Sequence, residues 1–594
     1  MAEEHIGQRK EMKAPWTKIF TAFKVALDIK KLLLAAGGIF VTAAGWWLLA
    51  VIFFALRSEP PNPAEYLADR KVEEKDEAWT TFRIARKRWN LLYELAGPTS
   101  TNPKDVRKVD AGDIAQTWQQ YEEISKSDQL DGKVLATLGT IKPHGRLRTW
   151  PWFEDRGENP YLLVTDNIKP SGSDVAPALP RERRPFVLSK QLLVLVEPLV
   201  KFLSPVAYFF EERAGPLVRV YLLGVILWTL AVWGFFGGAI TRMAAVQVAR
   251  NEKISMRDAL RFARERFQSF FSAPVFPLIF LGVLTFFLIL FGLFSGLIPI
   301  VGDVIIAGLL WPIVIVLGLI MAVVLVGLVG WPLMNATISA EGSDSFDALS
   351  RSYSYVYQAP WHYLWYSAVA LAYGAVLVFF VGLMGSLMVY LGQWGVSQAP
   401  FLSSSNPAND REPTYLFIDA PTSFGWRDLL LHGSQHAERK EVITPNGDRA
   451  IAYVMNEKYM KSMEWWNYIG AFLVSVWLYV LFLVIVGFGY SYFWTASTII
   501  YLLMRHKVDD TDLDEIHMEE EETEEPFGKD MTAAPVVPPA PKEAPAGNVT
   551  MVEAPSLRPT PAAAPTPGAT APGEAPAMEN KPGGDGTPPP PVNP

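Results

Sequence analysis

Two histidines in a polar stretch have the spacing of metal ligands on a helix. His432 and His436 are four residues apart, and Glu438 follows closely. Two imidazoles on one helical face together with a carboxylate could bind zinc. Gly433 and Ser434 lie between the histidines and disfavour that helix, and no further His or Cys nearby completes a set of ligands. We therefore interpret this stretch as a solvated loop.

An acidic run near the C-terminus has the spacing of a calcium-binding loop. Asp510, Asp512, Asp514 and Glu521 match positions 1, 3, 5 and 12 of an EF-hand, which supply the oxygen ligands that calcium requires. Position 6, where the sharp turn needs Gly, is Glu515. No convincing exit helix follows it. We therefore interpret the run as solvated and predict neither a metal site nor a bound metal.

Other catalytic chemistry has little support. The chain has no cysteine, which excludes disulfides, thiolate metal sites and thiol nucleophiles. His144 and nearby acids could supply a general base, but no spacing indicates a pair. Gly487 and Gly489 lie inside an apolar segment with no preceding strand, unlike a nucleotide-binding loop. We predict no catalytic or cofactor-binding residues, no cofactor and no enzymatic activity, with an enzyme in the external part as a less favoured alternative.

The elements around these residues are those of a membrane protein. Half of the 594 residues are hydrophobic, only 19% are charged, and the apolar residues form long blocks. Crossing about 30 Å of hydrocarbon takes roughly 20 apolar residues in a helix. The pattern predicts an all-α polytopic protein with six transmembrane helices: 32–56, about 216–240, 275–297, 304–333, 364–390 and 466–503. The fourth is overlong and should tilt or bend near Pro312.

One further apolar segment is ambiguous. Val187 to Phe210 contains Lys190, Glu197 and Lys201 together with two prolines. These residues favour an interfacial or packed helix over a span. If the segment does span, the number of transmembrane helices becomes seven.

Polar segments divide the chain further. The insertions between spans should be α+β, with a helix near Glu73 to Leu95, strand-like residues near Val134 to Trp152 and a hairpin from Glu441 to Met455 turning at Asn446 and Gly447. The full division is 1–31, a basic amphipathic helix; 32–56, the first span; 57–214, an insertion; 215–392, spans two to five; 393–463, a second insertion; 464–504, the sixth span; and 505–594, a disordered acidic, then Pro/Ala-rich tail.

An internal repeat relates two stretches between spans. Met243 to Pro274 and Met334 to Pro360 each begin beneath a span, contain Asp-Ala-Leu and end in Ala-Pro. Both stretches are amphipathic, with predicted apolar faces formed by Met256, Leu260, Ala263, Phe267 and Phe270, and by Phe346, Leu349, Tyr353 and Val356. The basic N-terminal helix resembles a third copy. The chain thus reads as three units, each an interfacial helix followed by a membrane hairpin.

Basic residues predict the orientation. Seven Lys or Arg lie in residues 1–31 and seven more in 241–272, whereas the turn near Gly296 to Gly302 has none. Since basic residues accumulate in short cytoplasmic loops, both termini should be cytoplasmic and both insertions extracytoplasmic, in a bacterial inner membrane. The tail should be a mobile arm whose removal leaves stability unchanged.

The repeated stretches also carry a resemblance. Residues Ala245 to Leu260 (AVQVARNEKISMRDAL) and Ala336 to Gly342 (ATISAEG) resemble poorly characterised bacterial multi-pass membrane families. One of these is the membrane domain that accompanies some glycerophosphodiester phosphodiesterases. The likeness covers about residues 215–392 and the last span, and it implies a helical membrane fold. It supplies no active residues, and because no phosphodiesterase domain accompanies it here, that activity is not implied.

These observations favour a non-enzymatic membrane protein that organises or assembles partners. Its expected partners are membrane lipids, and membrane or cytoplasmic proteins that contact the insertions and the tail. Gly292 and Gly296, like Gly234 and Gly238, have the spacing of helix-dimer motifs, which allows a homo-oligomer. Packing between helices of one chain is the favoured use of this spacing. No basic patch indicates nucleic acid. The alternative function is a permease or channel for a small solute or lipid.

The predicted topology places both insertions on one side of the membrane. The cysteine-free chain allows single cysteines to be introduced as reporters. An impermeant maleimide applied to intact spheroplasts should label the Ser100→Cys and Asp410→Cys variants alike. Labelling of one position but not the other would contradict the topology.

Overall fold

The structure is a computed structural model that describes most of the chain as far as residue 518. The described residues are 14–68, 70–97, 111–126, 145–147, 149–154, 156, 159–165, 187–297, 300–398, 414–432, 434, 436–443 and 449–518.

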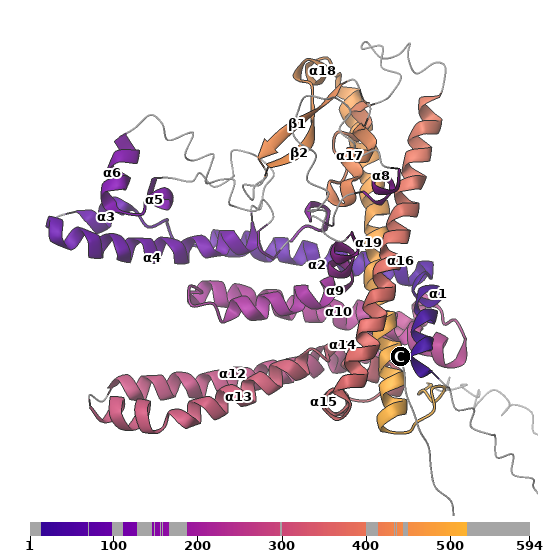
Figure 1. Ribbon diagram of the computed structural model, residues 1–594, viewed down its shortest axis with the longest axis horizontal. Coiled ribbons are helices and arrows are strands. Elements are labelled where there is room, and N and C mark those ends of the chain that lie inside the picture. The colour runs from indigo at the N-terminus through magenta and orange to yellow at the C-terminus, as the bar shows by residue number, and fades with distance from the viewer. Residues whose placement is uncertain are drawn as a thin grey trace, which may run out of the picture. The chain divides into compact units, whose positions relative to one another are not determined.

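Helices make up nearly all of the described elements (Figure 1). In chain order the elements are η1 Pro15–Thr21, α1 Ala22–Ala26, α2 Ile29–Ala55, α3 Pro63–Leu67, α4 Val72–Ala96, α5 Ala111–Ile114, α6 Trp118–Lys126, η2 Pro151–Phe153, α8 Pro160–Val164, α9 Val187–Phe209, α10 Pro216–Arg250, α11 Met256–Glu265, α12 Phe267–Leu297, the π-helix η4 Gly302–Leu309, α13 Trp311–Leu328, α14 Trp331–Glu341, α15 Ser345–Gln358, α16 Pro360–Ser397, η5 Thr414–Phe417, η6 Ser423–Gly425, α17 Trp426–Leu431, β1 Ala437–Ile443, β2 Arg449–Met455, α18 Glu457–Lys461 and α19 Trp465–Val508.

Seven of the described helices are long and apolar enough to cross a membrane: α2, α9, α10, α12, α13, α16 and α19. This is consistent with a membrane protein. Six spans were predicted, and the additional helix is α9, the segment whose charges and prolines argued against a span. Its prolines, Pro198 and Pro205, lie inside a continuous helix.

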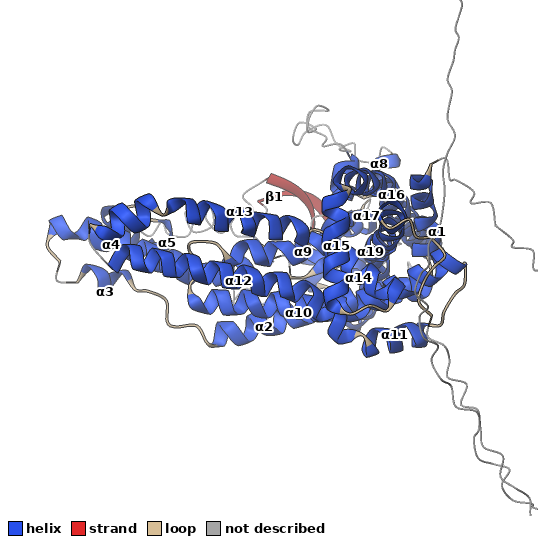
Figure 2. Cartoon of the chain, turned by 90° about the horizontal axis from the view of Figure 1, so that it is seen from below, coloured by secondary structure: helices blue, strands red, loops and turns tan. Residues whose placement is uncertain are grey.

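The contacts between long helices include those of α2 with α10, α12 with α13, and α16 with α19, but α19 also packs against α2 and α16 against α9. The first three are the pairs that the sequence joins as hairpins. However, α16 and α19 run across the direction shared by α2, α9, α10, α12 and α13 (Figures 1 and 2). Helices that all cross one membrane run roughly along its normal, and these seven helices run in two directions. The number of helices that cross the membrane therefore stays a prediction.

The two stretches that contain Asp-Ala-Leu have the same local structure. In each, the preceding helix ends at a residue whose backbone has the left-handed conformation: Asn251 after α10 and Gly342 after α14. The next helix then begins after a polar N-cap, Ser255 or Asp344, whose side chain accepts a hydrogen bond from the backbone N–H of the aspartate three residues later. A left-handed stop followed by a capped start redirects the chain at each junction.

The faces that α11 and α15 bury differ in part from those predicted. Ala259 and Ala348, the alanines of the two Asp-Ala-Leu sequences, are fully buried. Of the residues predicted for the two apolar faces, Ala263, Phe270 and Val356 are also buried within the chain, whereas Met256, Phe267 and Phe346 are exposed. The apolar faces therefore turn only in part toward the neighbouring helices.

The predicted fourth span is broken into three parts. The π-helix η4 ends before Trp311, close to the bend expected at Pro312, and a second break separates α13 from α14 at Gly330. Hydroxyl groups of α15 satisfy backbone carbonyls near this second break: Ser352 donates to the carbonyl of Gly330 and Tyr353 to that of Val324, both at 2.8 Å. Beyond the break, every residue from Trp331 to Ala340 is buried.

The two glycine pairs have different surroundings. A Cβ on Gly238 would lie 2.8 Å from the ring of Phe270, so this glycine allows α10 and α12 to approach each other. A Cβ on Gly292 or Gly296 would meet no atom within 4 Å. Packing inside the chain was the favoured use of both pairs. This prediction is confirmed for Gly238 but is wrong for Gly292 and Gly296.

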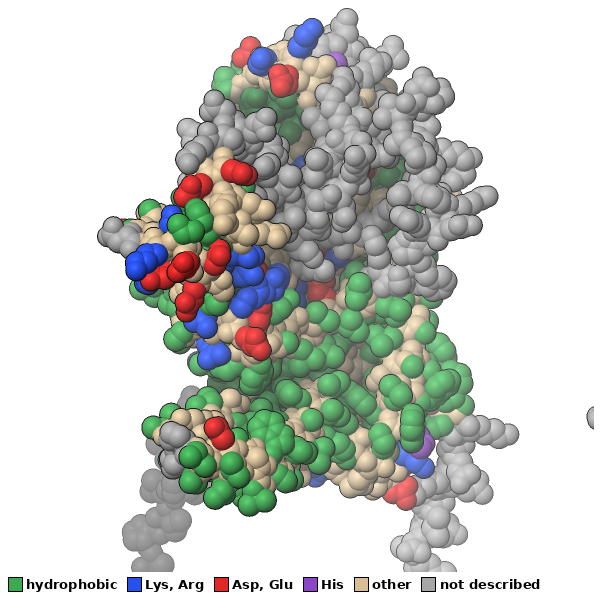
Figure 3. All heavy atoms as spheres, turned by 60° about the vertical axis from the view of Figure 1, so that its left-hand side comes forward, with side chains coloured by type: hydrophobic (Ala, Val, Ile, Leu, Met, Phe, Trp, Pro, Cys, Tyr) green, Lys and Arg blue, Asp and Glu red, His purple; other side chains and the backbone are tan. Residues whose placement is uncertain are grey.

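The hairpin of α12 and α13 is largely uncovered within the chain. Only 11% of the most apolar window of each helix is buried, and large side chains such as Phe286, Leu293 and Ile315 are more than half exposed. Apolar side chains cover much of the lower described surface in Figure 3, while acidic and basic side chains gather above it. Such a surface suits contact with hydrocarbon.

The insertions match the predictions in part. The expected helix near Glu73 to Leu95 is α4, and the hairpin is confirmed as strands β1 and β2, which pair antiparallel from Ala437 opposite Met455 to Ile443 opposite Arg449. Its turn residues lie outside the described ones. Where the structure describes the stretch from Val134 to Trp152, it has a turn and the start of η2 in place of a strand, since Pro151 begins a 3-10 helix.

Candidate functional site

The main candidate site is a cluster of ionised side chains buried between helices. We call Glu154, Arg156, Glu197 and Lys201, together with the hydroxyl of Tyr490, the inner network. Glu197 and Lys201 are one turn apart on α9, Tyr490 comes from α19, and Glu154 and Arg156 come from the first insertion. The side chains of Glu154, Arg156 and Glu197 are each less than 10% exposed.

Every charged group of the inner network has an opposite charge close to it. Arg156 Nη2 lies 2.9 Å from Glu197 Oε1 and 3.5 Å from Glu154 Oε2. Lys201 Nζ lies 2.6 Å from Glu154 Oε1 and 3.1 Å from Glu197 Oε1. Tyr490 donates to Glu197 Oε1 at 3.0 Å. Two acids and two bases therefore balance within one buried cluster.

Burial and charge act in opposite directions on these groups. Burial raises the pKa of Glu154, and the carboxylate of Glu197 raises it further; Lys201 and Arg156 lower it, but the pKa of Glu154 stays above its ordinary value. Burial opposes the charge of Arg156, but the two carboxylates raise its pKa overall. Removing such groups from water costs several kcal/mol per ion unless partners compensate. The opposite charges within the network offset part of this cost.

The same region joins the two insertions to the helices. Arg156 Nη1 donates to Ser423 Oγ at 3.0 Å, and the amide of Asn159 donates to the backbone carbonyl of Phe424 and to Ser386 Oγ, both at 3.0 Å. Ser423 and Phe424 belong to the second insertion, whereas Ser386 lies in α16. Segments far apart in the sequence are thus held together, as expected if both insertions lie on one side of the membrane.

The inner network offers little chemistry beyond binding charge. The guanidinium of Arg156 lies 5.8 Å from the ring centre of Phe482, and Lys201 Nζ lies 5.9 Å from that of Trp46, so aromatic faces support the cations. The carboxylates accept from groups of the protein itself. This is the arrangement of a structural ion cluster, and it nominates none of its members as a nucleophile.

Sequence reasoning missed this cluster. Glu197 and Lys201 are four residues apart, the spacing of an ion pair on a helix, and this was the one available signal. Their charges were instead taken as evidence that the helix lies at an interface. Nothing in the sequence around Glu154 or Arg156 indicates that they meet α9.

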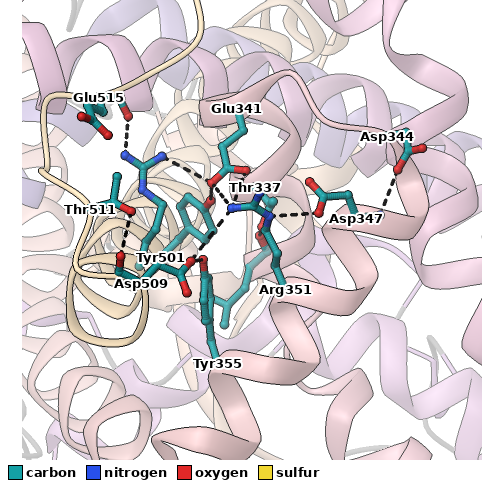
Figure 4. Close-up of polar contacts among 12 residues, drawn as sticks. Thr337, Glu341, Asp344, Asp347, Arg351, Tyr355, Tyr501, Asp509, Thr511 and Glu515 are labelled. Carbon is teal, nitrogen blue, oxygen red and sulfur yellow. Dashed lines mark hydrogen bonds and ion pairs between the residues drawn. The ribbon is translucent and has the colours of Figure 1, made fainter. Parts of the chain in front are cut away.

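A second cluster lies where α14 and α19 end beside α15, and Figure 4 shows its side chains converging. Arg351 of α15 pairs with Glu341 and Asp347, each at 3.0 Å. Tyr501 donates to Glu341, and Tyr355 donates to Asp509. We call these residues, together with Arg505, the end network. Burial opposes the charge of Arg351, yet its bond to Asp347 and the charge of Glu341 raise its pKa.

The segment after α19 packs onto this end of the helices. We call residues 509–518 the C-terminal strap. Arg505 donates to the backbone carbonyls of Asp512 and Glu515, at 3.1 Å to Asp512. The backbone of His517 donates to the carbonyl of Ala340 at 2.7 Å and accepts from Arg242 at 2.8 Å. The prediction of disorder from residue 505 is therefore wrong for residues 505–518, and residues 519–594 lie outside the described ones.

The strap borders a polar hollow of about 440 Å³. It is lined by Arg250 and Glu341, at the ends of α10 and α14, and by Asp514, Glu515, Ile516 and His517 of the strap. The acidic residues considered as calcium ligands do not form one calcium-binding loop among the described residues. Asp510 has a left-handed backbone, Asp512 binds Arg505 through its carbonyl, and Glu521 lies outside the described residues.

The histidine pair is not arranged as ligands on one helix. Helix α17 ends at Leu431, and His432 that follows has an extended backbone. His436 lies just before β1, where its ring stacks on that of Tyr459 with centroids 4.2 Å apart. In the described part of the chain, no three His, Cys, Asp or Glu side chains form a group suited to a metal ion.

The inner network makes a prediction about charge balance. Replacing Glu197 by Gln should lower the free energy of unfolding by about 3 kcal/mol, because it leaves two buried cations with one carboxylate. Replacing Lys201 by Gln as well should restore part of that loss. Chemical unfolding in detergent measures both, with Glu73→Gln on the exposed face of α4 as control. If the double variant is less stable than the single one, charge balance is not the cause.

The C-terminal strap makes a prediction about truncation. A chain ending at Met518 should melt like the full-length protein. A chain ending at Val508 should lose about 5 kcal/mol, because the five hydrogen bonds described above between the strap and the helices, each worth about 1 kcal/mol, disappear. Thermal unfolding of the two truncations compares them directly. Equal melting temperatures would mean that the strap contributes nothing, as the sequence alone suggested.

The chain was compared with known proteins at three levels. No protein-family model, no curated protein and no solved structure matches it. The resemblance to bacterial multi-pass membrane families therefore stays a prediction, and the function has to be argued from the geometry of the chain itself.

Proposed function

We propose that this chain is a non-enzymatic protein of the bacterial inner membrane that holds partner proteins together. In this proposal both termini are cytoplasmic, the insertions form an outer contact surface, and the segment beyond the C-terminal strap is the inner one. Partners would include membrane and cytoplasmic proteins. The observation that carries the proposal is the junction at Arg156 and Asn159, which fixes both insertions to α9 and α16.

A fixed outer surface suits a protein that assembles others. Partners that bind a preorganised surface do not have to order it, so less free energy is lost on association. The strap fixes part of the proposed inner contact surface in the same way, because it anchors the start of the tail to Ala340 and Arg242. A partner that binds the tail would then be held close to the ends of α10 and α14.

The charges of the inner network also favour assembly over transport. Coupled carriers keep ionisable groups in the membrane to bind a substrate or a proton. Glu197 and Lys201, which lie in a candidate span, are engaged by Arg156 and Glu154 instead. Binding a solute there would require breaking a balanced buried cluster, at a cost of several kcal/mol.

One observation favours the alternative, a permease or channel. Carriers often have helices broken in the membrane, whose freed backbone groups bind the substrate. The chain has such a break between α13 and α14, and one turn beyond it lies Asn335, fully buried with no hydrogen-bond partner among the described residues. At this break, however, Ser352 and Tyr353 already occupy the nearby carbonyls.

Cross-linking in native membranes, followed by purification and mass spectrometry, tests the proposal. The full-length chain should recover a reproducible set of proteins. Deleting residues 519–594 should remove the cytoplasmic members of that set. Replacing Glu73, Glu74 and Glu77, exposed acids on α4, by Lys should remove outer members while leaving the fold intact.

Two outcomes contradict the proposal. Identical protein sets from all three chains would show that neither surface binds partners. Solute flux through proteoliposomes of the purified protein, abolished by Asn335→Leu but not by the deletion of residues 519–594, would establish the permease instead.

A further inference from the structure

An apolar groove of about 300 Å³ lies between the N-terminal helical element and the two longest helices. Phe23 and Leu27 form one wall, Met384 and Met388 of α16 form another, and Ile485 of α19 contributes to the third side. Every side chain that lines the groove is apolar. The groove differs from both polar networks and plays no part in the proposed assembly of proteins.

The groove results from the way that the N-terminal element lies along α16. Trp16 packs against Trp365, and Phe20 packs edge-on against Tyr373 with ring centroids 4.9 Å apart. The 3-10 helix η1 contacts α16, and helix α1 contacts α19. Farther along, Gly385 allows α16 to approach α19 so closely that a Cβ would lie 2.3 Å from Ile485. The close approach forms the floor of the groove, and the N-terminal element forms its rim.

The lining determines what kind of group can occupy the groove. Apolar walls offer water no hydrogen bonds, so water there is unfavourable compared with bulk. A hydrocarbon chain loses nothing by entering and gains dispersion contacts. Met384 and Met388 have flexible, polarisable side chains that adapt to a chain of variable shape. The groove opens beside helices that are apolar enough to lie in lipid, where acyl chains are the abundant occupant.

The charge on the N-terminal element, next to the groove in the sequence, indicates the headgroup. Residues 14–27 contain two lysines, Lys18 and Lys24, and no acid, and the acid that follows, Asp28, lies 3.9 Å from Lys253. Lys24 follows Phe23 directly, precedes Leu27 by one turn and is exposed. Helix α16 contains no Asp, Glu, Lys or Arg that could balance this charge. Among the described residues, no carboxylate forms an ion pair with either lysine.

We propose that this groove binds one acyl chain of an anionic phospholipid, with the phosphate beside Lys24. The apolar walls and the unbalanced lysines match the two ends of such a molecule. A lysine near a membrane surface favours an anionic headgroup by about fivefold, which follows from roughly 1 kcal/mol per charge. The bound lipid would join the N-terminal element to α16 and α19.

Native mass spectrometry of the delipidated full-length protein tests the proposal. Phosphatidylglycerol or phosphatidylethanolamine with the same acyl chains is added, and the first lipid bound is quantified. The unaltered protein should bind phosphatidylglycerol about fivefold or more tightly than phosphatidylethanolamine. Lys24→Gln should reduce this preference by about fivefold while leaving phosphatidylethanolamine binding unchanged. Arg264→Gln, a change at an exposed basic residue of α11, is the matched control and should retain the preference.

Filling the groove tests the acyl-chain site separately. Met384→Trp or Met388→Trp places a large ring in the opening and should abolish the first binding event for both lipids. Ile289→Trp, at an exposed position of α12, is the control and should leave binding unchanged, and all variants should melt like the unaltered protein. Equal binding of the two lipids by the unaltered protein overturns the headgroup assignment. Undiminished binding by both folded methionine variants overturns the groove itself.

Discussion

Ionised side chains can be buried among apolar helices only when they are paired, and this constraint determines how the outer segments of the protein meet its helices. Glu197 and Lys201 on α9 pair with each other, and Glu154 and Arg156 of the first insertion bring a second pair of opposite charges against them. Once Arg156 is placed, its bond to Ser423 brings the second insertion to the same point. The position of α9, the path of the first insertion and the contact with the second are thus consequences of one requirement.

A related requirement governs the other end of the helices. Where α13 stops and α14 begins, backbone carbonyls lose their helical partners, and hydroxyls of α15 replace them. Helix α14 can then be short and buried on all sides. Its C-terminal residue, Glu341, holds Arg351, Tyr501 and Arg505, and the C-terminal strap closes over them. Polar side chains thus serve both the break between α13 and α14 and the end of α14.

The long apolar helices and their order could be predicted because hydrophobic runs of this length have few alternatives. The bend near Pro312, the helix α4 and the hairpin of β1 and β2 likewise follow from local signals. The inner network could not be predicted, since it joins residues up to 293 positions apart that share no local pattern. The faces of α11 and α15 that contact other helices were predicted only in part, because the apolar pattern indicates Ala263 and Val356 but not Ala259 and Ala348. Which small residue faces a neighbouring helix depends on how the helices pack.

The junction of the two insertions also has a consequence for biosynthesis. Arg156 and Glu197 are 41 residues apart, whereas Arg156 and Ser423 are 267 residues apart. At a translation rate of roughly 5 to 20 residues per second, the ribosome needs about 13 to 50 s to add the later partner. For most of that interval Glu197 is already present but Ser423 is not, so the first insertion lacks its hydrogen bond to the second. This delay leaves time for a chaperone or an early partner to bind the first insertion before the second one reaches it.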